Sequence, residues 1–395
     1  MISTFRMLAL SICIFSCSPE VGRNDEDGGA EKNIDSVDLG IVNDGAEKDI
    51  ASVDFRMDET GKGAQKKQTL LRPLGNKIYH AAFPDFGGSE DQVSVNRIMA
   101  FESMAQKPLT WAYFSNNWSE EKGIHFPSKD VKVINDFGRV PFIRLMARSN
   151  FDEGGPDPLL SIDVLLSGEK DEALRAWART ARDAKIPLLA EFGTEVNGDW
   201  FSWNAKWNGA GEKEYGDPDL YDGMEKFRDL YRKIINICRD EGALNITWFF
   251  HVDAYSSPRE DWNKMPGYYP GDDYIDWIGL SVYGPQRTDL GWWSFESLLD
   301  DNWDEISQIS QAGKPLALLE WGVVEGEDGQ KAKWIEEAMA TILPGGAYEN
   351  KFSAVSYWHE NFDQSRLRID TDPKSLSAYQ KMMAKDIFVN DALFE

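Results

Sequence analysis

The 395-residue sequence has few of the residues that cross-link a chain or bind a metal, with 3 cysteines and 4 histidines. Two of the cysteines, Cys13 and Cys17, lie within the first 17 residues, so Cys238 is the one thiol in the rest of the sequence. If that first segment is removed or lipidated, no intramolecular disulfide can form and the fold must depend on its apolar core. The histidines, at positions 80, 125, 251 and 359, show no metal-ligand spacing, and we expect no metal and no other cofactor.

Basic residues are also in deficit, because 42 Lys plus Arg stand against 67 Asp plus Glu and give a net charge of −25. A surface of this charge repels a phosphate backbone, so nucleic acid is excluded as a partner and a neutral or cationic substrate is favoured. Tryptophan is abundant by contrast, with 15 residues whose flat rings can stack on sugars.

The first 17 residues contain an apolar run that is too short for a permanent membrane helix. One positive charge, Arg6, precedes this run, which is the pattern of a signal peptide. Its end, "IFSC", is similar to a bacterial lipobox, in which Cys17 is lipidated and becomes the first mature residue. We therefore expect a lipid anchor in the bacterial cell envelope, at the outer membrane, facing the periplasm or the exterior. The alternative is a conventionally cleaved, secreted protein.

Residues 18–65 carry 13 Asp plus Glu, 5 Lys plus Arg and almost no aromatic side chains. Such a segment cannot bury enough apolar surface to offset its ordering entropy, and we expect a disordered acidic tether. Within it, "GAEKNIDSVD" at 29–38 recurs as "GAEKDIASVD" at 45–54, which indicates a spacer lengthened by duplication. The folded domain is then expected over residues 66–395.

That domain alternates short apolar runs with amphipathic helical patterns, which is typical of βα units around a parallel sheet. Because eight strands close a barrel, we predict a single (β/α)₈ TIM barrel with enlarged strand-end loops that acts as a monomer. A doubly wound open sheet would require a Gly-rich phosphate turn after an early strand, and the sequence has none. The predicted strands are 77–83, 109–115, 140–147, 186–193, 245–251, 274–283, 315–322 and 354–359, and helices are predicted between them, for example at 171–184, 223–242, 295–313 and 330–343.

Two glutamates lie at the ends of predicted strands, where the active site of such a barrel is built. Glu195 follows the fourth strand in "FGTEVNG", and Glu320 ends the seventh in "LLEWG". Either one alone is as well explained by capping or ion pairing, but together they match the pair that glycoside hydrolysis requires. One carboxyl group protonates the leaving oxygen, while the other, ionised, attacks the anomeric carbon or activates water. Tyr283, at the end of the sixth strand, is the candidate that holds the second carboxylate ionised.

Four segments, in order along the chain, give a more specific indication. "GTEVNGDWFSW", "YYPGDDYIDWIGLSVYG", "KPLALLEWG" and "RLRIDTDPKSLSAY" resemble motifs of glycoside hydrolase family 26, the endo-β-mannanase family of the retaining clan A barrels. The resemblance implies that Glu195 is the acid/base, that Glu320 is the nucleophile of a double displacement, and that Tyr283 positions the nucleophile. It also implies that Trp358 forms the floor of the central sugar subsite. The remaining candidate substrate-binding residues are Thr194, Trp200, Phe201 and Trp203, although packing in the core is the alternative for each aromatic residue.

Two positions depart from the family pattern. The residue before the acid/base is usually histidine in the family and is Thr194 here, and four residues before it the usual arginine is replaced by Glu191. Since side chains alternate along a strand, Glu191 and Glu195 share a face, and Glu191 is expected inside the barrel. An unpaired carboxylate there is costly, so we predict a partner, with Arg144 on the third strand as the candidate, or else a raised pKa.

These observations predict a retaining endo-β-glycanase whose partner is a polysaccharide, with β-1,4-mannan as the first candidate substrate. The same residues would serve a β-1,3- or mixed-linkage glucanase or a β-1,3-xylanase. A non-catalytic glycan-binding lipoprotein is the alternative from another functional class, and the presence of both glutamates argues against it.

Overall fold

A parallel β-barrel forms the centre of the computed structural model, which describes residues 67–395 apart from 88–89, 152 and 363–364. The predicted signal segment, Cys17 and the acidic tether lie outside the described residues. Eight strands run in chain order, each hydrogen-bonded in parallel to the next, and β8 pairs with β1 to close the barrel. Their bounds are β1 Ile78–Phe83, β2 Trp111–Asn117, β3 Val140–Met146, β4 Leu188–Phe192, β5 Ile246–Asp253, β6 Trp277–Tyr283, β7 Leu316–Gly322 and β8 Phe352–Trp358. The prediction of a (β/α)₈ TIM barrel is confirmed.

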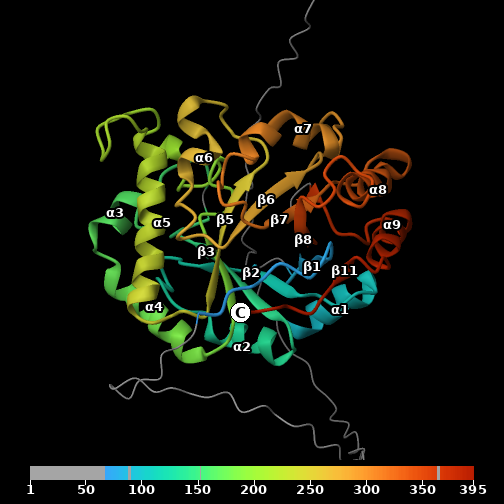
Figure 1. Cartoon of the computed structure of the whole chain (residues 1–395), viewed down its shortest axis with the longest axis horizontal. Helices are drawn as coiled ribbons and strands as arrows, with labels where there is room; N and C mark the ends of the chain where they lie inside the picture. The colour runs from blue at the N-terminus through green and yellow to red at the C-terminus, as the bar shows by residue number, and fades with distance from the viewer. Residues whose placement is uncertain (1–66, 88–89, 152, 363–364) are drawn as a thin grey trace, which may run out of the picture. The chain divides into compact units, whose positions relative to one another are not determined.

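Helices surround the strands, as Figure 1 shows. In chain order they are α1 Val95–Ala105, α2 Ser128–Asp136, α3 Ile162–Ser167, α4 Asp171–Ala184, α5 Asp222–Asp240, α6 Met265–Tyr268, α7 Phe295–Ile306, α8 Gln330–Ile342 and α9 Pro373–Met383. Short elements complete the set: β11 Phe388–Val389 pairs with β1, and β9 Asn361–Phe362 pairs with β10 Ser365–Arg366. Within the described residues, no helix has the length and apolar character needed to cross a membrane.

Helix α7 is shorter than predicted, since it ends at Ile306 and not near residue 313. The segment that follows is rich in polar side chains that bond to the last turn. The Ser307 hydroxyl donates to the carbonyl of Asp304 at 3.1 Å, and the Gln308 amide donates to the same carbonyl at 2.7 Å. These bonds compete with the helical pattern and favour a turn.

The inside of the barrel consists of layers that follow from the alternation of side chains along each strand. One layer is aromatic: Trp111, Phe142, Phe249 and Trp277 lie with neighbouring ring centroids between 4.6 and 6.2 Å apart. Two residues further along the same strands, towards their carboxyl ends, the buried side chains become polar. Tyr113 follows Trp111, Arg144 follows Phe142, and His251 follows Phe249. The apolar layer supports the barrel, and the polar layer lies directly below the strand ends.

Candidate active site

Glu195 and Glu320 lie at the same end of the barrel. Glu320 is in β7, and Glu195 is three residues past the end of β4. Both are buried, with 4% of Glu320 and 8% of Glu195 exposed. Glu195 is among the charges that raise the pKa of Glu320, so the two carboxyl groups interact electrostatically. The structure therefore brings together the two residues that the sequence indicated for chemistry.

A tight turn sets the position of Glu195. Gly193 has a φ of 67°, and a Cβ atom there would lie 2.4 Å from the Phe227 ring, so the position requires glycine. Glu195 itself has a φ of 47°, an uncommon conformation for a residue with a side chain. Two backbone bonds hold the turn, from the Val196 N–H to the His251 carbonyl at 3.3 Å and from the Gly198 N–H to the Glu195 carbonyl at 2.8 Å. Strained backbone of this kind is found at functional sites, where the surrounding structure maintains it.

Trp200 holds the Glu195 carboxyl group. Its indole Nε1–H donates to Oε2 of Glu195 at 2.9 Å, and the tryptophan is half-buried. The Cβ of a larger residue at position 198 would overlap this indole, so Gly198 gives the ring its place. The aromatic residue expected to contact substrate therefore also orients the candidate acid/base.

Glu320 receives hydrogen bonds and an ion pair from three other strands of the barrel. The Tyr283 hydroxyl of β6 donates to Oε2 at 2.9 Å, and the Tyr113 hydroxyl of β2 lies 3.3 Å from Oε1. Nη2 of Arg144, from β3, lies 3.5 Å from Oε1. Burial raises the pKa of Glu320 to about 7, an effect that Arg144 opposes and Glu195 reinforces. The ionisation of this carboxyl group is thus set by the balance of its neighbours.

Arg144 is the central cation of the site and is 3% exposed. Its Nη1 donates to Oε2 of Glu90 at 3.0 Å and to the Ser115 hydroxyl at 3.2 Å. The guanidinium also lies over the Trp358 ring, 4.9 Å from its centroid. These contacts fix the charge beside Glu320. Glu90 was not predicted as a site residue, because it lies outside every predicted strand and helix.

The expected partner of Glu191 is present, together with two partners that were not foreseen. Nε of Arg144 lies 3.6 Å from Oε1 of Glu191. Shorter contacts come from the Tyr113 hydroxyl, 2.5 Å from Oε1, and from Nδ1 of His251, 3.0 Å from Oε2. Burial alone would raise the pKa of Glu191, but His251 and Arg144 hold it below its usual value. The predicted contact between Glu191 and Arg144 is confirmed, and the alternative of a raised pKa is wrong. Alternation by two along β2 and β5 would have placed Tyr113 and His251 in the barrel, had it been applied there.

Thr194 is 1% exposed, and its hydroxyl lies 2.8 Å from Nδ1 of His251. This places the Thr194 side chain in the polar layer, where it contacts His251 and is covered by protein. Thr194 can therefore influence a bound substrate only through the residues around it. Trp203 is 2% exposed and donates from Nε1 to the Thr194 carbonyl at 2.9 Å. Phe201, half-buried, stacks on Trp203 with ring centroids 4.5 Å apart. The packing alternative is favoured for Trp203, whereas Phe201 keeps part of its surface exposed.

Trp358, at the end of β8, stacks on Phe83 of β1 with centroids 4.2 Å apart and an interplanar angle of 11°. It is 5% exposed. With Arg144 also over the ring, the indole is held rigidly beside the polar layer. Trp358 thus lies next to Arg144, the cation that pairs with Glu320. This position agrees with the expected role of Trp358 as the floor of the central sugar subsite.

Three side chains in this layer have the donor atoms of a metal site: one atom each from Glu191, His251 and Glu320 lies within 4.8 Å of the others. A cation among them would face the guanidinium of Arg144, which lies 3.5 Å from Glu320 and 3.6 Å from Glu191. The same oxygens already contact Tyr113. We therefore interpret the set as a hydrogen-bonded network.

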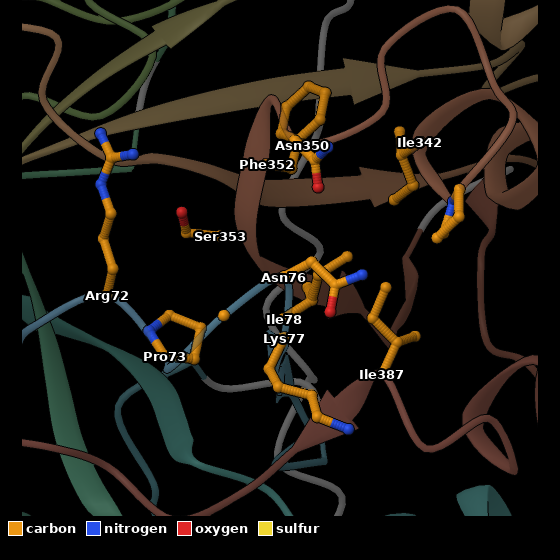
Figure 2. A pocket seen from close by; sticks show the side chains of 12 residues that line it. Arg72, Pro73, Asn76, Lys77, Ile78, Ile342, Asn350, Phe352, Ser353 and Ile387 are labelled. Carbon is orange, nitrogen blue, oxygen red and sulfur yellow. The ribbon is translucent and has the colours of Figure 1, made fainter.

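A pocket at the opposite end of the barrel carries none of the candidate residues (Figure 2). It lies beside the first residues of β1 and β8, where Ile78 and Phe352 contribute to its wall. Two basic side chains at its edge are already engaged, since Arg72 donates to the Gly313 carbonyl and Lys77 to the Asp386 carbonyl. The location away from the strand carboxyl ends does not suit catalysis in this fold.

The chain is similar to several known proteins. Residues 165–340 match the model of glycosyl hydrolase family 26. Endoglucanase H of Acetivibrio thermocellus is 29% identical over 190 residues, 47% of this chain and 19% of that protein. The β-1,3-xylanase TXYA of a Vibrio species is 28% identical over 171 residues, 42% of this chain and 31% of that protein. The mannan endo-1,4-β-mannosidase of Bacillus subtilis is 29% identical over 269 residues, 62% of this chain and 66% of that protein. This chain thus spans less than a third of the length of the first two.

Among solved structures, the Bacillus subtilis mannanase BCman superposes with a TM-score of 0.53 at 17% identity, covering 81% of this chain and 88% of that one. At this identity the likeness concerns the fold, and it agrees with the barrel described above.

Proposed function

We propose that the protein is a retaining endo-β-glycanase that hydrolyses a β-linked polysaccharide, and the match of residues 165–340 to the model of glycosyl hydrolase family 26 supports this proposal. The observation that carries this proposal is the placement of Glu195 and Glu320 at one end of the barrel, with Tyr283 bonded to Glu320 at 2.9 Å. Retaining chemistry requires carboxyl groups about 5 to 5.5 Å apart, one to attack and one to transfer a proton.

In the proposed reaction, the Glu320 carboxylate attacks the anomeric carbon while Glu195 gives its proton to the leaving glycosidic oxygen. A bond from Glu320 to the sugar forms as the glycosidic bond breaks. Glu195, now ionised, takes a proton from water, whose oxygen displaces Glu320 from the anomeric carbon. The products are two shortened chains and a regenerated pair of carboxyl groups. Tyr283 and Arg144 hold Glu320 in the orientation for attack.

We propose β-1,4-mannan as the first candidate substrate. The family match and the mannan endo-1,4-β-mannosidase of Bacillus subtilis, the relative aligned over the longest stretch of those described, support this choice. The high tryptophan content and the acidic charge suit a neutral polysaccharide.

A β-1,3-xylan or a mixed-linkage or β-1,3-glucan is the second candidate. It is favoured by Thr194, which departs from the family pattern beside the acid/base, and by similarity to a β-1,3-xylanase and an endoglucanase. The catalytic residues would be the same.

A panel of soluble β-mannan, β-1,3-xylan, mixed-linkage glucan and β-1,3-glucan tests the proposal by release of reducing ends. We expect reducing ends to be released from mannan. The rate of release should be lower by a factor of about 10³ or more in Glu320→Ala and in Glu195→Gln. Glu336→Gln, an exposed residue of the outer helix α8, is the matched control and should keep full activity. Release from xylan or glucan without release from mannan would transfer the proposal to the second substrate class. Binding of a glycan without hydrolysis of any would indicate the non-catalytic alternative.

The location of the enzyme is a separate proposal. We propose that Cys17 carries the lipid anchor and that residues 18–65 tether the barrel, at residues 66–395, to the cell envelope. Metabolic labelling with a radioactive fatty acid should mark the protein of natural sequence and not the variant Cys17→Ser. Recovery of unlabelled protein from the culture medium would support the secreted alternative.

A further inference from the structure

Three buried side chains near Glu320 have no role in the two displacement steps of the proposed reaction. Tyr113, Glu191 and His251, from β2, β4 and β5, are each 0% exposed. Burying a carboxyl group, an imidazole and a phenol together in the barrel is costly unless they are paired. Their contacts show both how they are paired and what they act upon.

Glu191 uses both carboxyl oxygens within this group. Oε1 accepts from the Tyr113 hydroxyl at 2.5 Å, and Oε2 lies 3.0 Å from Nδ1 of His251. The Tyr113 oxygen also lies 3.3 Å from Oε1 of Glu320. A phenol has one proton, so Tyr113 stands between two carboxyl groups and can donate to one of them at a time. Glu191 and Glu320 are therefore linked through a single hydroxyl group.

The surrounding strands fix the imidazole of His251. Its Nε2 lies 2.9 Å from the Ser281 hydroxyl of β6, and its Nδ1 lies 2.8 Å from the Thr194 hydroxyl. Gly279 of β6 is paired with His251 in register, and a Cβ at position 279 would lie 3.3 Å from the ring. Both ring nitrogens thus have partners and the ring has a fitted space.

Carboxyl groups outnumber cations around His251. Four carboxyl groups face it: Glu191 from β4, Glu195 from the turn after β4, Glu320 from β7 and Asp253 from its own strand, β5. One guanidinium, that of Arg144 from β3, contacts the same layer. Burial raises the pKa of Asp253 well above its usual value, which favours the neutral form of that side chain. Burial alone would lower the pKa of His251, but Glu191, Glu320 and Glu195 raise it above its usual value. The carboxyl groups around His251 therefore favour its protonated form, which would add a second positive charge to the layer beside Arg144.

We propose that Tyr113, Glu191 and His251 form a positioning unit that orients Glu320 and favours its ionised form, with the His251 imidazolium supplying positive charge and the Tyr113 hydroxyl placed beside Oε1 of Glu320. The inference rests on the proposed function, because it assigns Glu320 as the nucleophile. None of the three side chains touches the sugar. When Glu320 becomes bonded to the sugar and loses its charge, the single Tyr113 proton is donated to Glu191, and His251 keeps Glu191 as its counter-ion.

The direct test is the titration of His251 by NMR of the full chain labelled with ¹⁵N-histidine. The chain has 4 histidines, so the signals can be assigned with His251→Gln or, if that variant does not fold, with single variants of the other three. We expect His251 to titrate above its usual range in the unmodified protein. Its pKa should fall by about one unit or more in Glu191→Gln and in Glu320→Gln, since each loses an anion beside the ring. The pKa of His251 should stay in place in the control Glu336→Gln, an exposed residue of the outer helix α8. An unshifted His251 in Glu320→Gln would overturn the proposal.

The pH dependence of hydrolysis provides a second readout that a merely structural role would not move. His251→Gln should shift the acidic limb of kcat/KM to higher pH, because loss of the cation raises the pKa of Glu320. Glu191→Gln/His251→Gln removes one charge of each sign and should return the limb towards its original position. Tyr113→Phe should lower kcat about 10-fold or more with KM changed less than about threefold. A reduced rate with an unmoved limb in His251→Gln would contradict the unit.

The two hypotheses fail in different ways. If no glycan is hydrolysed while His251 responds to Glu320→Gln, the proposed function fails and the electrostatic unit stands. If hydrolysis requires Glu320 but His251 does not respond to it, the unit fails and the proposed function stands.

Discussion

Glu320 should set the acidic limit of the enzyme. Burial raises its pKa to about 7, and only the ionised carboxyl group can attack the anomeric carbon. As the pH falls below about 7, kcat/KM should therefore fall tenfold for each pH unit. The acidic limb of the kcat/KM profile reports the ionisation of the nucleophile in the free enzyme. A pH–rate profile from pH 4 to 9 measures this limb. A limb at the ordinary pKa of a glutamate would show that the cations around Glu320 outweigh its burial.

Tyr283 contributes through a single hydroxyl group. Tyr283→Phe keeps the ring and removes the donor to Oε2 of Glu320, which lies at 2.9 Å. We expect kcat to fall by about 10- to 100-fold, corresponding to a charge-assisted hydrogen bond worth about 1.5–3 kcal/mol. Tyr215→Phe is the control, because that hydroxyl bonds to Asp229 of the outer helix α5. Equal effects of the two substitutions on steady-state rates would remove Tyr283 from the mechanism.

At this scale, the sequence was most informative where a strand ends, and inside the barrel it indicated Glu191 and Arg144 but not Tyr113 or His251. Glu195, Glu320 and Tyr283 could be identified because polar residues after apolar runs mark the catalytic end of the barrel. Tyr113 and His251 lie within apolar runs, and only the closure of the barrel brings them to Glu191. Glu90 comes from a loop, and no periodicity places a loop residue. Trp203 was a candidate substrate-binding residue but is buried in the core. A cluster of aromatic residues in the sequence does not reveal which of the rings is buried.

Helix α8 carries a buried lysine that holds the segment after β8. Nζ of Lys331 donates to the carbonyls of Arg366 and Arg368 at 2.9 and 2.6 Å and to the Thr371 hydroxyl at 3.0 Å. Lys331→Met keeps the apolar stem and removes the buried donor that these three acceptors share. We expect the free energy of unfolding to drop by about 2–4 kcal/mol. Urea unfolding measures the change, and Lys333→Met, an exposed residue of the same helix, should be nearly neutral. Similar stability losses in both variants would contradict this role for Lys331.

The strands and helices were the most predictable level of the structure. The eight predicted strands coincide with β1 to β8 to within a few residues, because each is a run of apolar residues bounded by turns. Helix α4 begins and ends at the predicted residues. The end of α7 was misplaced because side chains of Ser307 and Gln308 compete for a backbone carbonyl, an effect that hydrophobic periodicity does not contain.

The charge of the whole molecule should decide between neutral and anionic substrates. With a net charge of −25, the protein repels polyanions over a distance of about 10 Å at 0.1 M salt. We expect KM for a carboxymethylated form of the best substrate to exceed that for the neutral form at low salt, and the difference to shrink as salt is raised. Initial rates on the matched pair of polymers at 0.01 and 0.3 M sodium chloride measure this. A KM that is equal for both polymers at both salt concentrations would show that the charge lies away from the cleft.

The central claim is that Glu195 and Glu320 act together in a retaining double displacement. The most direct measurement is proton NMR of the new reducing end during the first minutes of hydrolysis of a β-linked oligosaccharide, before the anomers interconvert. The β anomer should accumulate first, because two successive displacements restore the original configuration. The α anomer appearing first would mean a single displacement and would contradict the assignment of Glu320 as the nucleophile.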